Sequence, residues 1–189
     1  MKKSTFTVAL LAVISITLMS FTKLGGDEKQ IKLSDISASL SAFQGVEGQD
    51  FIGNSIAYKV VDKDKYDNVF KESALVYATI MQVNGTIEGI NKGTIATDSD
   101  FAKANIGFAT KDIPEMKARI EKLQEQLKTL KPKDDFKGLE MKKVPKAADG
   151  INVAQKQLTE SSSLLPKISE NLVEVAKDRK STRLNSSHT

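Results

Sequence analysis

The sequence predicts an all-α fold, an up-down bundle of four or five unequal helices. Apolar residues recur every three or four positions through most of the chain, which is the period of one helix face. Capping residues and prolines stand at the ends of these periodic stretches, where helices begin and stop. Together the two observations favour a single helical domain over residues 34–177.

The first expected element is a short helix that begins at Ser34. The Ser34 hydroxyl can cap the first turn, and Ile36 and Leu40 follow at a spacing of four. The polar residues before it, 23–33, are expected to form a flexible lead-in. Residues 51–61 stay open between strand, helix and loop, because their β-branched residues show no clean alternation.

A long helix is predicted next, with Asp62 or Asp64 as its cap and a periodic pattern that reaches Asn91. Such a helix has roughly 27 residues and a length of roughly 40 Å. Gly85 and Gly89 lie in its last third and Gly93 follows it closely, and a glycine costs up to about 1 kcal/mol relative to alanine inside a helix. An early end near Asn84 is therefore the alternative.

Two further helix starts follow along the chain. Asp98 or Ser99 can cap a brief segment, and Asp112 opens the next helix. Glu115 stands three residues after Asp112, which is a capping-box spacing with Asp in the place of Ser or Thr. The periodic pattern of this helix stops at Pro132.

The last helix is predicted over residues 147–177, packed antiparallel against the helix of residues 113–131. Pro166 cannot donate to the carbonyl of Ser162, so we expect a kink there. The two helices carry a narrow apolar stripe, which favours a seam inside a bundle over a docking site for a foreign helix. The candidate helix-pairing stripe comprises Ile113, Met116, Ile120, Leu123, Leu127, Leu130, Ile151, Leu158, Leu165, Ile168 and Leu172.

A lysine-rich loop is predicted between these two helices, over residues 131–146. Such a loop could attract anionic lipid headgroups, cell-wall polymers or an acidic partner. Three acidic residues within it dilute the charge, so the favoured alternative is a solvated loop without a partner. The candidate anionic contact surface consists of Lys131, Lys133, Lys137, Lys142, Lys143 and Lys146.

The N-terminus is expected to be an export signal over residues 1–22. Lys2 and Lys3 precede an apolar run from Val8 to Met19, which has the length of a signal peptide rather than of a membrane span. No clear cleavage site follows, so an uncleaved anchor is the alternative. A bacterial export signal implies contact with the export machinery and a periplasmic or extracellular location. Any membrane contact is then peripheral or through the uncleaved leader.

Residues 178–188 resemble the translation of a common short-read sequencing adapter. Eleven residues in order, from Asp178 to His188, match that translation. The segment 178–189 is therefore expected to be a non-native, disordered tail, with a natural polar tail as the alternative. Because the helical spacing persists to Val175, we expect the natural chain to continue beyond this point.

Without the leader and this tail the chain is formally neutral. Between Phe21 and Lys177 there are 23 basic and 23 acidic residues, against 28 and 24 in the whole sequence. The sequence pI of about 9.1 therefore gives no support to nucleic-acid binding. We expect no nucleic-acid partner.

The same part of the chain contains no His, Cys or Trp. Disulfide scaffolds, imidazole or thiolate zinc sites and catalysis by Ser-His-Asp or Cys-His are thereby excluded. Asp62, Asp64 and Asp67 resemble the start of a calcium loop, but the twelfth position holds Ser73 instead of Glu, so helix capping is favoured. No catalytic, cofactor or metal residues are predicted.

The sequence thus predicts an exported, non-enzymatic protein that acts through helix surfaces, as an envelope adaptor, a chaperone-like binder or a structural component. We expect a protein partner, or self-association through helices. The alternative is a small-ligand carrier with an aromatic pocket between helices, and the third hypothesis is a carboxylate-dependent hydrolase. The aromatic residues that would line such a pocket are Tyr58, Tyr66, Phe70, Tyr77, Phe101 and Phe108.

Overall fold

The computed structural model describes residues 28–32, 34–36 and 56–186, with side chains up to residue 176. The predicted export signal lies outside these residues, and so does most of the predicted first helix. Of that helix, residues 34–36 are helical, and the amide of Ile36 donates to the carbonyl of Lys32.

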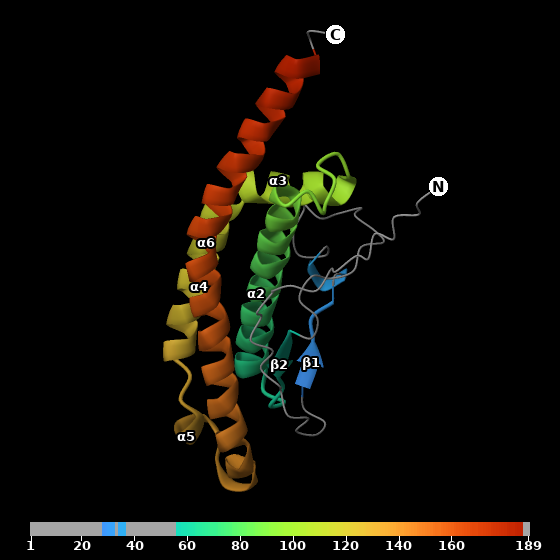
Figure 1. Cartoon of the computed structure of the whole chain (residues 1–189). Helices are drawn as coiled ribbons and strands as arrows, with labels where there is room; N and C mark the ends of the chain where they lie inside the picture. The colour runs from blue at the N-terminus through green and yellow to red at the C-terminus, as the bar shows by residue number, and fades with distance from the viewer. Residues whose placement is uncertain (1–27, 33, 37–55, 187–189) are drawn as a thin grey trace, which may run out of the picture.

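The fold is an up-down arrangement of three long helices, which confirms the predicted all-α class. Helix α2 (Asp64–Asn91), helix α4 (Ile113–Lys128) and helix α6 (Val144–Ser186) lie side by side, and the chain direction alternates from one to the next (Figure 1). Helix α3 (Asp100–Lys111) lies across the end of the bundle where α2 finishes.

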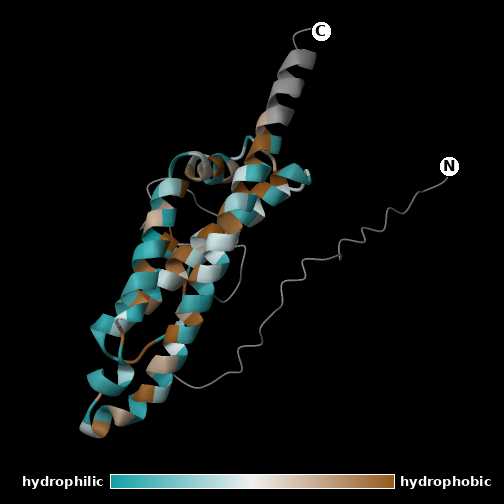
Figure 2. Cartoon of the chain, turned by 90° about the vertical axis from the view of Figure 1, so that its left-hand side faces the viewer, coloured by the Kyte–Doolittle hydropathy of each residue, from teal (hydrophilic) through white to brown (hydrophobic). Residues whose placement is uncertain are grey.

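Helix α2 is the central element of this bundle. More than half of its residues are buried, on several faces, and it packs against α3, α4, α6 and strand β2. Such all-round burial is typical of a helix inside the core of a domain. Figure 2 shows hydrophilic residues on the outer faces of the helices and hydrophobic residues turned inward. The antiparallel pair of α4 and α6 is confirmed, but the larger partner of α6 is the parallel helix α2.

A two-stranded antiparallel sheet lies beside α2, formed by β1 (Glu28–Gln30) and β2 (Ala57–Lys59). The prediction of a flexible lead-in over residues 23–33 is wrong for β1, and the undecided stretch 51–61 contains β2. Two contacts hold β2 to α6. The side-chain amide of Gln157 donates to the carbonyl of Ala57 at 3.0 Å, and the Lys59 ammonium lies 3.3 Å from the Asp149 carboxylate.

Helix α2 begins one residue away from either predicted cap. Lys63 is the N-cap and makes no side-chain cap hydrogen bond, while Asp62 has a left-handed φ of 55°. The Asp67 carboxylate instead accepts from the backbone N–H groups of Val61 and Lys63, at 2.7 and 3.1 Å. An acid within the first turns therefore holds the helix start, where the helix dipole favours negative charge.

The helix does not end early near Asn84 but continues to Asn91, and Gly89 is used for packing. A side chain at Gly89 would begin 2.6 Å from Cδ1 of Ile95, so the glycine lets the following turn fold back over the helix. The amides of Thr94 and Ile95 both donate to the Gly89 carbonyl. Gly93, with a φ of 70°, makes the turn that follows the helix.

The predicted starts of α3 and α4 have different outcomes. The Ser99 hydroxyl accepts from the amide of Ala102 at 3.1 Å, which confirms the predicted cap of α3. Asp112 occupies the N-cap position of α4 but its carboxylate makes no cap hydrogen bond, so the predicted capping box is wrong. The reason is that Asp112 also ends α3 and keeps helical backbone angles, whereas a capping side chain needs an extended backbone.

We expect Ser99→Ala to lower the free energy of unfolding by about 1 kcal/mol, because it removes a cap hydrogen bond from α3. Asp112→Ala is the matched control, and its effect should be less than about 0.5 kcal/mol. Urea denaturation followed by circular dichroism measures both changes. Equal losses in the two variants would contradict this assignment of the caps.

The lysine-rich segment 131–146 is mostly helical, so the prediction of a loop there is wrong. It contains the one-turn helix α5 (Pro132–Asp135), the 3-10 helix η2 (Gly138–Lys143) and the start of α6. Helix α4 ends at Lys128, three residues before the predicted end at residue 131, so Pro132 does not stop it. Pro132 instead begins α5, because the fixed φ of proline suits the first turn of a helix. Helix α6 begins at Val144, three residues before the predicted start.

Helix α6 is continuous through Pro166 and extends to Ser186. In Figure 1 its upper part leans away from the direction of its lower part, in the manner expected of a proline in a helix. The helix includes residues 178–186, which were predicted to be disordered. The side chains of that segment lie outside the described residues, and its non-native origin stays a prediction.

Candidate functional site

The candidate helix-pairing stripe lies inside the bundle. Met116 and Ile120 of α4 are at most 2% exposed, and Leu158 and Ile168 of α6 are fully buried. Ile113, Ile151 and Leu172 are half-buried, and the other members of the stripe are buried. All of them belong to or pack against the same core cluster. The stripe is therefore occupied within this chain, and a foreign helix could reach it only by displacing α2, α4 or α6.

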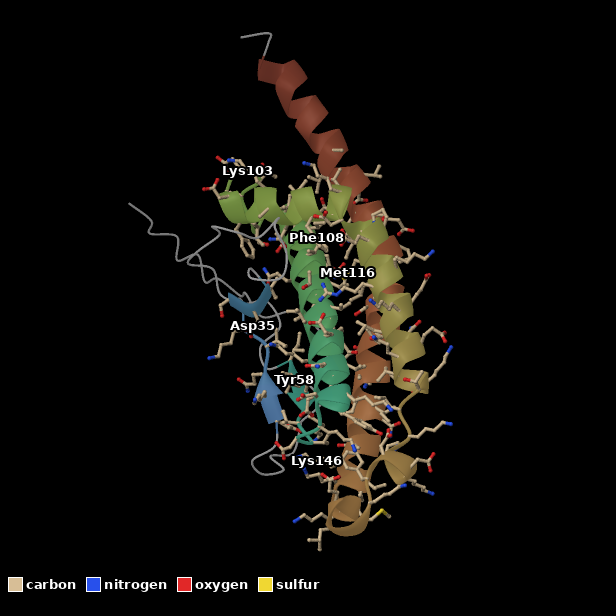
Figure 3. All side chains as sticks on the ribbon, turned by 180° about the vertical axis from the view of Figure 1, so that it is seen from behind. Asp35, Tyr58, Lys103, Phe108, Met116 and Lys146 are labelled. Carbon is tan, nitrogen blue, oxygen red and sulfur yellow. The ribbon has the colours of Figure 1, made fainter. Side chains whose placement is uncertain are left out.

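The six predicted lysines are brought together at the opposite end of the molecule from α3. We call the segment 131–146 the basic tip; it forms the lower end of the bundle in Figure 1, and Lys146 is labelled there in Figure 3. Lys143 is half-buried and lies 3.6 Å from the Asp62 carboxylate, and Lys146 is also half-buried. The exposed lysines of the tip are Lys131, Lys133, Lys137 and Lys142.

One aromatic side chain fastens the basic tip to the bundle. Phe136, between α5 and η2, is fully buried. Its ring centroid lies 5.2 Å from that of Tyr66 in α2, and the Lys63 ammonium lies 4.7 Å from the Phe136 centroid. Ring packing and a cation–π contact therefore connect the tip to the first turn of α2.

Asp135 forms the polar part of the same connection. Its carboxylate accepts from the Tyr66 hydroxyl at 2.7 Å, from the Lys65 ammonium at 3.0 Å and from the amide of Lys131 at 3.3 Å. The Lys63 ammonium also donates to the backbone carbonyl of Asp135. The hydrogen bond from Tyr66, followed by that from Lys65, lowers the pKa of Asp135 from 3.8 to about 2. Burial, followed by the same hydrogen bond, raises the pKa of Tyr66.

Because the pKa of Asp135 is lowered, the free energy of unfolding of the protein depends on pH in the acid range. A carboxyl group whose pKa is lower in the folded state stabilises the fold above its unfolded pKa, and this contribution disappears as the pH falls through the folded value. We therefore expect Asp135→Asn to be less stable than the wild type above about pH 4, and this difference to disappear towards pH 2.

Urea denaturation at several pH values between 2 and 6 measures this effect. The exposed neighbour Asp134→Asn is the matched control and should follow the wild-type profile more closely. A constant difference between Asp135→Asn and the wild type across this pH range would contradict the assignment.

The basic tip also exposes two large apolar side chains, which the sequence analysis did not single out. Leu139 is 94% exposed and Met141 is 50% exposed, and both belong to η2. Hydrophobic segments are visible among hydrophilic ones at this end of the bundle in Figure 2. The sequence does contain a signal for them. Leu139 and Met141 stand two positions apart in a lysine-rich segment, a spacing that does not fit one face of an α-helix.

A second feature is a partly open recess of about 510 Å³ between the small sheet and α2. Its lining is mostly charged and polar, with Tyr58 as its aromatic member (Figure 3). Burial, followed by the charges of Asp35 and Asp67, raises the pKa of Tyr58. The lining residues are Glu28, Lys29, Gln30, Ile31, Lys32, Asp35, Tyr58 and Lys71.

The other aromatic residues predicted for a ligand pocket do not line this recess. Tyr66, Phe70 and Phe108 are at most 1% exposed, and the rings of Tyr66 and Phe70 pack edge to face with centroids 6.0 Å apart. Phe101 is 4% exposed, while Tyr77 is half-buried against the core. Burial and the nearby Glu160 carboxylate raise the pKa of Tyr77. These five residues are core residues or pack beside the core.

The acidic residues considered as metal ligands make contacts within the protein. Asp67 accepts backbone hydrogen bonds at the start of α2, Asp62 faces Lys143, and Asp64 lies in the first turn of α2. No group of three or more His, Cys, Asp or Glu residues suited to holding a metal ion occurs in the described part of the chain. Asp67 thus serves to hold a helix start and Asp62 to form an ion pair.

No protein-family model, curated protein or solved structure matches this chain. Among the described helices, none is both long and apolar enough to cross a membrane. On the described surface, the basic tip combines exposed cations with exposed apolar side chains.

Proposed function

We propose that this chain is an exported, non-enzymatic binding protein of the cell envelope, and that it contacts an anionic partner through its basic tip. The observation that carries the proposal is the gathering of exposed lysines and two exposed apolar side chains at one end of a long bundle. The bundle itself acts as the support that holds this end in place.

The helix faces along the sides of the bundle are less suited to binding a partner. The apolar stripe of α4 and α6 is buried in the chain's own core. Three large hydrophobic side chains are exposed among the described residues, and two of them, Leu139 and Met141, belong to the tip. An apolar group next to cations is the usual composition of a surface that binds an anionic partner with an apolar component.

The tip is also built as a defined structure, which supports binding over a purely solvated loop. Phe136 and Asp135 attach it to Tyr66, Lys63 and Lys65 of the first turns of α2. Because these contacts fix the backbone before η2, and α6 begins directly after it, less conformational entropy is lost when the tip binds.

Lysine footprinting tests this proposal without requiring a known partner. We expect a bacterial envelope fraction to slow acetylation of Lys133, Lys137 and Lys142 at least about threefold, a protection of under 1 kcal/mol. Three exposed lysines on the sides of the bundle, Lys117, Lys122 and Lys167, serve as the matched control. Mass spectrometry of the acetylated peptides measures both sets.

Protection of the tip lysines alone would support the proposal. Equal acetylation of the tip with and without the envelope fraction would overturn it, and so would stronger protection of the three side lysines.

A further inference from the structure

We infer that the anionic partner of the basic tip is a lipid bilayer, into which Leu139 and Met141 insert while the neighbouring lysines bind the headgroups. This inference rests on the proposed function and adds the chemical class of the partner. It depends on how η2 displays its side chains.

The geometry of η2 separates its residues into three edges. In a 3-10 helix, residues three positions apart stack along one edge, roughly 6 Å from each other. Leu139 therefore shares an edge with Lys142, and Met141 shares an edge with Gly138, which has no side chain to cover it. Met141 thus has no side chain beside it on its edge, and Leu139 has a cation directly next to it.

The third edge of η2 carries Glu140 and Lys143. Lys143 is half-buried and faces Asp62 at the start of α2, whereas Glu140 is exposed. The other two edges hold both apolar side chains and the exposed Lys142. The acidic residue of η2 therefore lies on a different edge from Leu139 and Met141.

The position of Leu139 argues for a partner with an apolar interior. A leucine that is 94% exposed at the end of a bundle gains nothing from binding a purely polar polymer such as a phosphate-rich chain. A bilayer provides anionic headgroups that the lysines can bind. It also provides hydrocarbon below the headgroups, where the apolar side chains can insert. Acidic proteins and wall polymers are the other outcomes of the test.

A tryptophan placed at the tip reports insertion directly, since the chain contains no Trp of its own. We expect the emission of the full-chain Leu139→Trp variant to shift to shorter wavelengths with vesicles of equal phosphatidylglycerol and phosphatidylcholine. Phosphatidylcholine alone should give no shift. Val173→Trp is the matched control, because Val173 is 54% exposed and lies in α6 well beyond its start at Val144, and its emission should stay unchanged. The export leader is present in both variants and does not distinguish them.

The lysines are tested in the same Leu139→Trp protein. Changing Lys137 and Lys142 to Gln should weaken the vesicle affinity of the tip by about fivefold for each lysine at low salt. Changing Lys117 and Lys122 to Gln instead should leave the affinity unchanged.

The outcomes distinguish this inference from the proposed function. Absence of an emission shift at position 139, combined with footprint protection of the tip lysines, would overturn the lipid inference and leave a polymer or protein as the anionic partner. Absence of both would overturn the proposed function as well. An equal shift with neutral vesicles would overturn the role of the lysines.

Discussion

Replacing Phe136 with alanine is expected to lower the free energy of unfolding by about 3–5 kcal/mol. Phe136 is fully buried between the basic tip and α2, with Tyr66 and Lys63 against its ring. Its truncation leaves a cavity where the tip packs against the first turn of α2. Urea denaturation monitored by circular dichroism measures the loss.

Leu139→Ala is the matched control, three residues further along the chain. Because Leu139 is 94% exposed, its removal should change the stability by less than about 0.5 kcal/mol. Similar small losses in both variants would show that Phe136 does not anchor the tip. Together the two variants separate the residue that supports the tip from the residue that we propose to bind.

Gly150→Ala is expected to destabilise the protein by about 2 kcal/mol, although alanine is the better helix former. Gly150 lies in α6 opposite Phe70 of α2, and a methyl group there would approach Cε2 of Phe70 to 2.4 Å. The Phe70 ring is 1% exposed and has no free space to move into. The helices would have to separate, which loses packing along the largest interface of the fold.

Gly107→Ala is the control for helix propensity alone. Gly107 lies inside α3, and a methyl group there meets nothing within 4 Å. We expect a gain of up to about 1 kcal/mol, opposite in sign to the change at Gly150. Thermal unfolding measures both variants. If Phe70→Leu is added to Gly150→Ala, the combined loss of stability should be smaller than the sum of the single losses. The reason is that leucine leaves room for the methyl group of the alanine.

The sequence was a good guide to the features that depend on neighbouring residues. The spacing of apolar residues predicts α4 and most of α2, and the Ser99 cap of α3 is confirmed. The grouping of lysines between residues 131 and 146 is visible in the sequence, and the structure places all six at one end of the bundle.

The features that the sequence analysis missed depend on residues far away along the chain. Strand β2 is held to α6 by Gln157, a residue 100 positions beyond Ala57. The folding of the segment 131–146 depends on Phe136 and Asp135 meeting Tyr66, about 70 positions earlier in the chain. A local pattern of lysines and acids cannot indicate such partners, and it was accordingly interpreted as a loop.

The sequence by itself determined the helical class, the apolar stripe and the lysine group, because each follows from residue types within a few helical turns. Only the tertiary structure decided which of these residues are buried in the core and which are exposed for binding. It buries the stripe against α2, which removes it as a binding surface, and it leaves Leu139 exposed beside Lys142. The physical reason is that burial is a property of the whole packing arrangement, so the same apolar residue becomes core or contact surface according to what lies opposite it.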